Sequence, residues 1–219
     1  MRIKVVIPTL LWHPVQPLIN DLAQGTVRPE KIYVIDNSGR FYSPKSIDIG
    51  WVEIIFPGEN IGVNASWNAG IELCADCDAV ALLNDDIRVG RRFVEKIISA
   101  FDGRDNAGVV CPLTHDYPPG ELPEMPVIRM RKREGWAMTI RKELFDKMPR
   151  IPSDRIRTFC GDDWIWHWAH RLGYRWYKDM GNCIRHEVGV SMAENPQIRA
   201  TLRSEKEEFA KIIRELKAA

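Results

Sequence analysis

Acidic and amide side chains gather where the most apolar stretch of the chain ends. Asn84, Asp85 and Asp86 come directly after the run AVALL at residues 79–83. Two carboxylates beside an amide at the end of a strand suit a hard divalent cation such as Mn²⁺ or Mg²⁺. Such an ion bridges a diphosphate and neutralises the charge that develops on a leaving group. The segment therefore predicts metal-assisted chemistry on a phosphorylated ligand.

Three other predicted strands also run into polar residues. These residues are Pro8 and Thr9, then Asp36, Asn37 and Ser38, then Gly58, Glu59 and Asn60. Because ligands of open α/β sheets lie beyond the carboxyl ends of the strands, we expect a polar cleft at this edge. Each group alone is also what an ordinary turn contains, so it is their convergence that favours a ligand site.

Amides and glycines recur every two to four positions in GENIGVNASWNAGI, residues 58–71. They are Asn60, Gly62, Asn64, Asn68 and Gly70. This pattern indicates a helix N-terminus suited to an anionic or hydroxyl-rich ligand. The chain has no G-x-G-x-x-G after its first strand and no G-x-x-x-x-G-K-[ST], which argues against a dinucleotide enzyme and a P-loop NTPase.

The later part of the chain adds candidate catalytic residues. Asp162 and Asp163 lie just before a predicted helix, where carboxylates either cap the helix or act in catalysis. His186 follows a strand and is either a metal ligand or a surface residue. Of the many tryptophans, most are expected in the core, and Trp136 or Trp164 is the candidate to stack on an acceptor.

The elements that position these residues alternate between strands and helices. We predict strands at 3–7, 31–35, 52–56, 79–83 and 108–111, and helices at 14–24, 63–75 and 91–102. A proline-rich loop from Pro112 to Pro126, expected to be a lid beside the acceptor, precedes one or two strands within 127–140. A helix at 164–172, strands at 174–178 and 183–186, and an amphipathic helix from Pro196 complete the chain. This indicates one α/β domain with a mostly parallel central sheet, flanking helices and a C-terminal amphipathic helix.

The composition is that of an ordinary globular protein: 219 residues, 45% hydrophobic and 28% charged, with a net charge of +1. Five scattered cysteines favour free thiols in a reducing compartment. The N-terminal apolar run is too short to span a membrane. We therefore expect a cytoplasmic protein, peripheral to the membrane or, for a viral protein, in the host cytoplasm as alternatives. Residues 129–133 (RMRKR) are either a solvated segment or a landing site for an acceptor bearing phosphate.

Together, and in their order, these motifs resemble the GT-A glycosyltransferases of family 2, a Rossmann-like class, over roughly residues 3–191. The matching elements are Pro8-Thr9, Asp36-Asn37, Asn60 to Gly70, Asn84 to Asp86, Gly135-Trp136-Ala137, Asp162-Asp163 through Gly173-Tyr174, and His186 with Ser191. The resemblance implies an inverting transfer of a sugar from a UDP-, GDP- or dTDP-sugar to an acceptor hydroxyl, with Mn²⁺ or Mg²⁺. The acceptor would be a glycan, a lipid-linked glycan or modified nucleic acid.

The resemblance also implies roles by position. Thr9 and Asp36 would contact the nucleoside, Asp86 would be the main metal ligand with His186 as the second, and Asp162 would be the general base. Donor binding would also involve Pro8, Asn37, Asn60, Gly62, Asn64, Asn68, Asn84 and Asp85, with Asn68 near the diphosphate or the donor sugar. Two positions depart from the family pattern: Asn84 replaces a carboxylate, and the base motif is usually Glu-Asp. Counting back from Gly173 selects Asp162, and a shift of one residue selects Asp163.

We expect residues 1–111 to bind the nucleotide sugar, residues 112–194 to form the acceptor and catalytic half, and residues 195–219 to form a C-terminal helix. Single transfer is favoured over processive synthesis. Two alternatives remain: a nucleotidyltransferase of related fold, and a non-catalytic module that binds sugar nucleotides or glycans. The nucleotidyltransferase would usually carry a glycine-rich basic segment after the first strand, where this chain has PTLLWHP.

Overall fold

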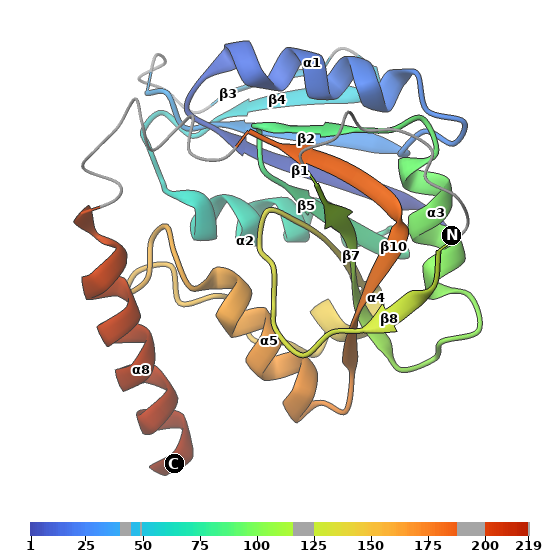
Figure 1. Cartoon of the computed structure of the whole chain (residues 1–219). Helices are drawn as coiled ribbons and strands as arrows, with labels where there is room; N and C mark the ends of the chain where they lie inside the picture. Colours follow the sequence, from blue (N-terminus) through green and yellow to red (C-terminus); the bar gives the residue numbers. More distant parts are fainter. Residues whose placement is uncertain (40–44, 49, 116–124, 188–199, 219) are drawn as a thin grey trace.

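A single ten-stranded sheet forms the centre of the computed structural model, which describes residues 1–39, 45–48, 50–115, 125–187 and 200–218 (Figure 1). The strand order is β3-β4-β2-β1-β5-β9-β7-β10-β6, and β8 pairs with β10. The strands are β1 (Ile3–Thr9), β2 (Lys31–Asp36), β3 (Lys45–Asp48), β4 (Val52–Phe56), β5 (Ala79–Leu83), β6 (Ile87–Val89), β7 (Ala107–Thr114), β8 (Val127–Arg129), β9 (Ala137–Arg141) and β10 (Arg175–His186). The helices are α1 (Trp12–Ala23), α2 (Val63–Leu73), α3 (Phe93–Phe101), α4 (Lys142–Phe145), α5 (Gly161–Arg171) and α8 (Leu202–Ala218).

The sheet is mostly parallel, as predicted. The register places β4, β2, β1, β5, β7 and β10 in one direction and β3, β9, β6 and β8 in the opposite direction. β1 lies between β2 and β5, so its end is flanked by the ends of two parallel neighbours. This arrangement brings Thr9, Asp36 and the residues after Leu83 to one edge of the sheet.

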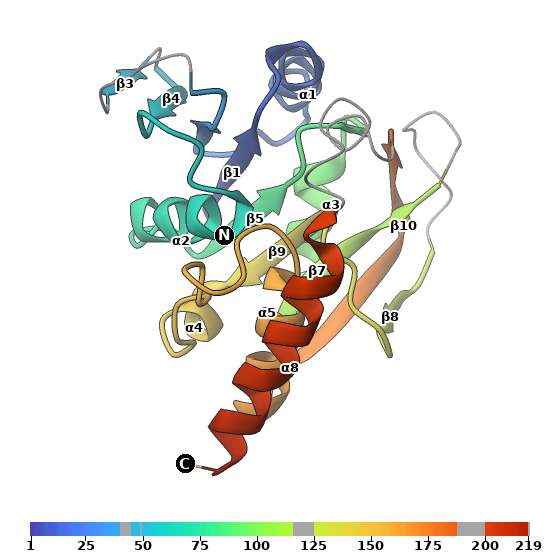
Figure 2. The same cartoon turned by 90° about the vertical axis from the view of Figure 1, so that its left-hand side faces the viewer.

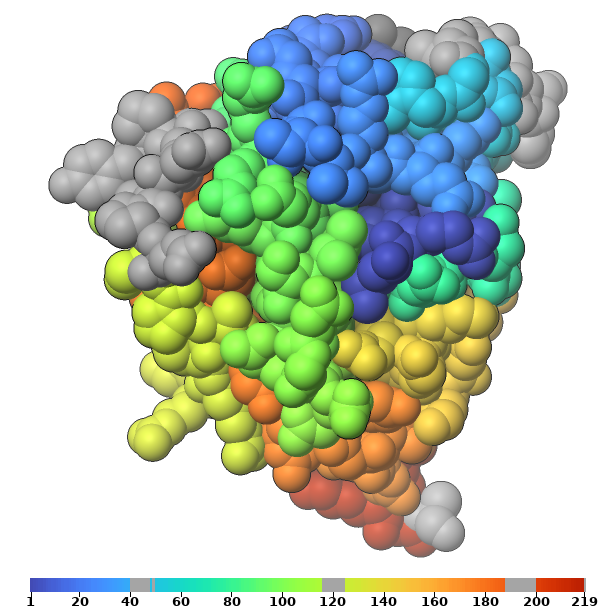
Figure 3. Space-filling model, turned by 90° about the vertical axis from the view of Figure 1, so that its right-hand side faces the viewer, coloured from blue at the N-terminus to red at the C-terminus, as the bar shows by residue number. Residues whose placement is uncertain are grey.

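Helices cover both faces, because successive side chains of a buried strand point to opposite sides. Val5 and Ile7 of β1 pack in the cluster that contains α1 and α3, which Figure 3 shows in blue and green. Val6 packs in the second cluster, which contains α2, α5 and the C-terminal α8. Figure 2 shows α8 running along α5 on this second face. The result is three layers with two apolar cores.

Several boundaries differ from the sequence-based expectation. β7 continues through Pro112 to Thr114, so the loop predicted from Pro112 starts later; the rest of that prediction falls on 116–124, which are outside the described residues. The two strands predicted at 174–178 and 183–186 form one strand, β10, with a register shift between Asp179 and Cys183. Strands β3 and β6 and the short helix α4 were not predicted.

The structure also bears on the predictions about the cysteines and about membrane-spanning segments. All five cysteines are free and buried. Within the described ranges, no helix combines the length and the apolar character that crossing a membrane requires. Strands from both predicted halves belong to the same sheet, and the functional division at residue 111 stays a prediction.

Candidate functional site

The ends of β1 and β2, where the nucleoside is predicted to bind, are joined by a hydrogen bond. The backbone N–H of Asn37 donates to the carbonyl of Thr9 at 2.7 Å. Asp36 is buried and accepts two hydrogen bonds, from Trp12 Nε1 at 2.7 Å and from the Ser38 N–H at 2.8 Å. A carboxylate has about four acceptor positions, so Asp36 retains capacity for a ligand N–H.

Asp85 links the end of β5 to β1. Its Oδ2 accepts a hydrogen bond of 2.6 Å from the Thr9 hydroxyl, and its side chain is buried. Burial is the largest cause that raises the pKa of Asp85 to about 6, and the neighbouring charge of Asp86 acts in the same direction. The Thr9 hydrogen bond opposes the rise. The site therefore holds an unfavourable buried negative charge near neutral pH, which a bound cation would compensate.

Asp86 and His186 meet although 100 residues separate them. The Nε2 of His186 lies 3.1 Å from Oδ1 of Asp86, and the two side chains are 9% and 8% exposed. The antiparallel pairing of β10 with β6 produces this contact, because His186 lies opposite Ile87, the residue after Asp86. The N–H of Glu187 also donates to the carbonyl of Asp86 at 2.9 Å. The two residues predicted as metal ligands are thus adjacent.

A carboxylate oxygen beside an imidazole nitrogen is a donor set that suits Mn²⁺. The described residues contain no group of three or more His, Cys, Asp or Glu side chains placed to hold a metal. A metal ion at this pair would therefore have two protein ligands and would complete its shell with ligand oxygens and water. Asn84 contributes a backbone hydrogen bond, in which its N–H donates to the carbonyl of Trp136 at 2.8 Å.

Trp136 connects Asp86 and His186, the predicted metal ligands, to Asp162, the predicted base. Its ring stacks on His186 with the centroids 5.4 Å apart and an angle of 26° between the planes, and its Nε1 donates to Thr114 Oγ1. Gly135, the preceding residue, packs so closely on Asp162 that a Cβ there would lie 2.9 Å from the Asp162 Cγ. The structure thus gives Trp136 a partner in the site itself. Its predicted stacking on an acceptor stays a prediction.

Asp162 and Asp163 differ in how Arg133 holds them. Arg133 contacts both carboxylate oxygens of Asp163, with Nη2 at 2.6 Å from Oδ2. Its Nε lies 3.4 Å from Oδ2 of Asp162. Burial is the main cause that raises the pKa of Asp162, and the Arg133 charge opposes it. Asp163 is therefore the paired carboxylate and Asp162 the one with more freedom to accept a proton.

The helix that carries Asp162 starts earlier than predicted. α5 begins at Gly161, and Cys160, with a left-handed φ of 63°, precedes it. Asp162 is therefore in the first turn and is not the N-cap residue. Gly161 is needed because a Cβ there would lie 2.1 Å from the Asn64 Oδ1.

The amides at the start of α2 hold other parts of the chain. Asn64 Nδ2 donates to the carbonyls of Ile156 and Phe159 at 2.7 and 2.9 Å. Asn68 exchanges two hydrogen bonds with the Ile151 backbone, at 2.8 and 3.0 Å.

Two further residues that were predicted to bind the sugar nucleotide, Asn37 and Asn60, also form hydrogen bonds within the protein. Asn37 donates from Nδ2 to Ser66 Oγ at 2.9 Å and accepts at Oδ1 from the Ile61 N–H at 3.1 Å. Asn60 accepts from the Gly62 N–H at 2.9 Å. The contacts in the structure are those of a scaffold, and donor binding by these residues stays a prediction.

Trp164 lies in the core, and its predicted stacking on an acceptor stays a prediction. Trp164 is 4% exposed, packs in the core with Trp168, and donates from Nε1 to the carbonyl of Pro149 at 2.9 Å. The helical spacing that places 164 and 168 on one face indicated this packing.

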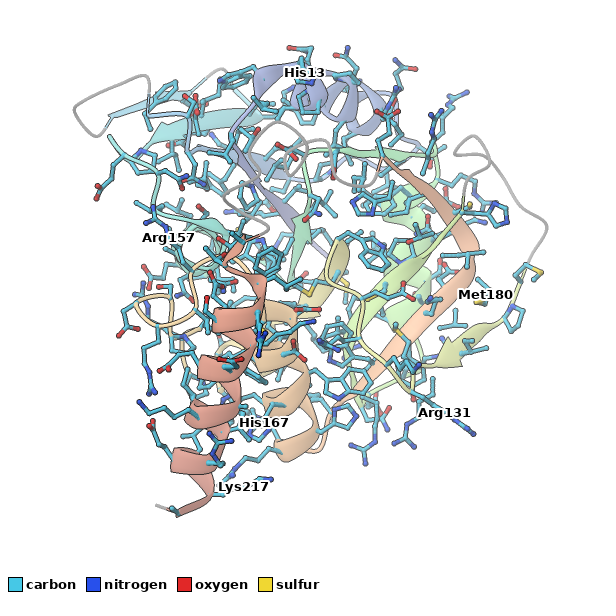
Figure 4. All side chains as sticks on the ribbon, turned by 60° about the vertical axis from the view of Figure 1, so that its left-hand side comes forward. His13, Arg131, Arg157, His167, Met180 and Lys217 are labelled. Atoms are coloured by element: carbon cyan, nitrogen blue, oxygen red, sulfur yellow. The ribbon has the colours of Figure 1, made fainter. Side chains whose placement is uncertain are left out.

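Sequence reasoning missed Trp12 as a part of the site and grouped Arg133 with its basic neighbours. Trp12 and Arg133 contact predicted site residues directly, but no motif distinguishes them from other aromatic and basic residues. The remaining basic residues of the 129–133 segment are Arg129, Arg131 and Lys132. Their side chains are exposed and have no ionic or hydrogen-bonding partner in the described part of the chain. Figure 4 labels Arg131 at the outer edge of the molecule, on the side of β8.

No protein-family model and no curated protein sequence matches the chain. Among solved structures, it is similar to GalNAc-T7 with UDP, GalNAc and Mn²⁺, with a TM-score of 0.67 and 12% identity over 84% of this chain and 43% of that chain. It is also similar to the mannosyltransferase PcManGT from Pyrobaculum calidifontis in complex with GDP-Man and Mn²⁺ (TM-score 0.67, 15% identity, 97% of this chain and 64% of that one). A third is S. aureus TarS 1-349 in complex with UDP-GlcNAc (TM-score 0.57, 12% identity, 88% and 61%).

The chain spans less than two thirds of the length of each of these proteins. At identities of 12–15% the likeness concerns the arrangement of the elements. The central sheet, the flanking helices and the C-terminal helix all have counterparts in this group. The chain has the fold of the GT-A glycosyltransferases.

Proposed function

We propose that the chain is a glycosyltransferase that moves a sugar from a nucleoside diphosphate carrier to an acceptor hydroxyl, in a single inverting transfer. One observation carries the proposal: a pair of side chains suited to a metal ion is connected, through two consecutive residues, to a partly buried carboxylate. Asp86 and His186 form the pair, and Gly135 and Trp136 connect them to Asp162. Nucleotides bound in the similar structures support the donor class.

Asp86 and His186 would hold Mn²⁺ or Mg²⁺. Their donor atoms are close together and shielded from water, and burial raises the pKa of Asp85 near them. When bound, the ion would neutralise charge on the leaving diphosphate. Thr9 and Asp36 would contact the nucleoside, since they lie at the ends of β1, which pairs with β5, and of β2, which pairs with β1.

Asp162 would accept the proton of the acceptor hydroxyl. The hydroxyl oxygen forms a bond to the anomeric carbon while the bond from that carbon to the diphosphate oxygen breaks, and the nucleoside diphosphate leaves. Arg133 engages Asp163, which supports Asp162 as the proton acceptor. A positioned general base contributes about 10²–10⁴-fold in rate.

The acceptor side would recognise phosphate. Arg129, Arg131 and Lys132 are exposed and unpaired within the described residues, although the chain as a whole carries a charge of only +1. They lead directly into Arg133, which contacts Asp162. An acceptor that bears phosphate, such as a lipid-linked glycan, would therefore find a complementary surface beside the base.

The test is release of nucleoside diphosphate by the purified chain from UDP-, GDP- and dTDP-sugars, with Mn²⁺ and with EDTA. We expect slow hydrolysis of one donor class in Mn²⁺ and none in EDTA. Release of pyrophosphate from a nucleoside triphosphate would instead identify a nucleotidyltransferase. A thermal shift with a sugar nucleotide, but no release even when acceptors are supplied, would identify a binding module and refute the transferase.

A further inference from the structure

The C-terminal helix contains a buried charge that the proposed reaction does not use. Glu205, in the first turn of α8, is 7% exposed. Its Oε2 accepts two hydrogen bonds from backbone N–H groups, from Thr158 at 2.8 Å and from Phe159 at 2.7 Å. Burying a carboxylate is unfavourable unless such donors compensate for lost water, so this contact fixes the backbone at 158–159 to α8.

The segment at 151–159 is held from two sides. From α2, Asn64 and Asn68 bond its carbonyl groups. From α8, Glu208 and Glu215 pair with Arg155, at 2.5 Å and 2.7 Å for the closest contacts. Helices α8 and α5 are also neighbours: Figure 4 shows Lys217 near His167. Burial lowers the pKa of His167, and the charges of Arg171 and Lys217 act in the same direction.

The held segment leads directly into the proposed base. Phe159 precedes Cys160, whose left-handed backbone is uncommon for a residue with a side chain, and Asp162 follows two residues later. A residue keeps such a conformation only when its surroundings hold it there. The Glu205 hydrogen bonds act on the two residues directly before this turn.

We propose that Glu205 is a positioning residue, which acts through the 158–160 backbone to set the place of Asp162 in the acceptor half of the site. The inference rests on the proposed function. It makes α8 part of the catalytic apparatus even though none of its described residues is assigned to the donor site.

Two substitutions separate the hydrogen bonds from the charge. Glu205→Gln keeps an acceptor oxygen for both N–H groups, whereas Glu205→Met keeps the length of the side chain and removes the acceptor. Glu207→Met is the matched control, because Glu207 is on the same helix, 67% exposed and paired only with Arg203 in the described residues. The measurements are kcat, donor KM and amide hydrogen exchange over residues 156–163.

We expect Glu205→Met to speed exchange at Thr158 and Phe159 by about tenfold or more. It should lower kcat by about tenfold or more and leave donor KM within about twofold, because a small displacement of a reacting group is costly. Glu205→Gln and Glu207→Met should stay within about threefold of the wild type in kcat. Circular dichroism checks that each variant is folded.

Unchanged exchange in Glu205→Met would overturn the proposal, and so would faster exchange with an unchanged kcat. A parallel loss of kcat in Glu205→Gln would assign the effect to charge and also refute it. A wild-type protein without any turnover refutes the proposed function, and the catalytic role with it. The hydrogen-exchange measurement does not depend on turnover, and it still decides whether Glu205 holds the backbone at Thr158 and Phe159.

Discussion

Replacing Asp85 with asparagine should make the metal-free protein more stable. Burial holds the pKa of Asp85 at about 6 in the folded chain, against an ordinary value of 3.8. The folded state therefore favours the protonated acid. This contribution to the free energy of unfolding is complete below pH 3.8 and is lost as the pH rises to about 6. The difference of about 2 in pKa corresponds to about 3 kcal/mol at pH 8.

Asparagine has nearly the same shape, can accept the Thr9 hydrogen bond and carries no charge. Urea unfolding in EDTA should show the Asp85→Asn variant more stable than the wild type by up to about 3 kcal/mol at pH 8. About 1.5 kcal/mol of that advantage should disappear between pH 8 and pH 5. The control is Asp105→Asn, at an exposed position, for which we expect no such pH-dependent gain.

A variant that is less stable than the wild type at pH 8, or an advantage that is constant from pH 5 to pH 8, would refute this reasoning. Confirmation would have a functional meaning. A wild-type chain that tolerates an unfavourable buried charge at the edge of its sheet retains that charge for something other than folding. A cation bound to Asp86 and His186 is the counter-charge we propose.

Four further predictions concern three side chains: Asp86, Asp162 and Asn68. Asp86→Ala should abolish the tighter binding of nucleoside diphosphate in Mn²⁺ relative to EDTA, and calorimetry that finds equal affinities in the wild type would contradict the metal assignment. Asp162→Asn should keep donor affinity and lose about a hundredfold or more in turnover, whereas a loss only in Asp163→Asn would move the base by one residue. Wild-type turnover should also fall as the pH drops through the raised pKa of Asp162, seen in a kcat–pH profile. Asn68→Ala should cost about 2–3 kcal/mol in urea unfolding, because it leaves the buried Ile151 backbone groups unpaired.

The sequence predicted the buried strands best. The strands at 52–56 and 79–83 have the boundaries that were expected, because runs of mostly apolar and β-branched residues have few alternative structures. Three short elements were missed because they contain too few residues for a hydrophobic periodicity to be detected. They are the strands β3 and β6 and the four-residue helix α4. β7 extends through Pro112 because its partner β10 continues alongside, which is a tertiary effect that local proline content conceals.

The residues of the candidate site were found where a motif gives both position and type. The approach of Asp86 to His186 could be anticipated only from the family resemblance, since 100 residues separate them and β6, which aligns them, was not predicted. Arg133 was grouped with its basic neighbours, yet in the structure it turns inward to the two aspartates while Arg131 and Lys132 stay exposed. Sequence cannot make that distinction, because it depends on where α5 lies relative to the segment before β9.

The amides of α2 show why a motif can be recognised for one reason and exist for another. Asn64 and Asn68 look like ligand-binding residues because amides at a helix start suit anions and hydroxyl groups. In the structure they are buried and satisfy backbone groups of the segment that leads to Asp162. Unpaired backbone groups are costly in a buried site, so a loop that must hold a base needs such partners. On this reasoning the spacing of the motif is set by the geometry of that loop as well as by any donor. Contacts from α2 and α8 together hold the segment that leads to Asp162, the proposed base.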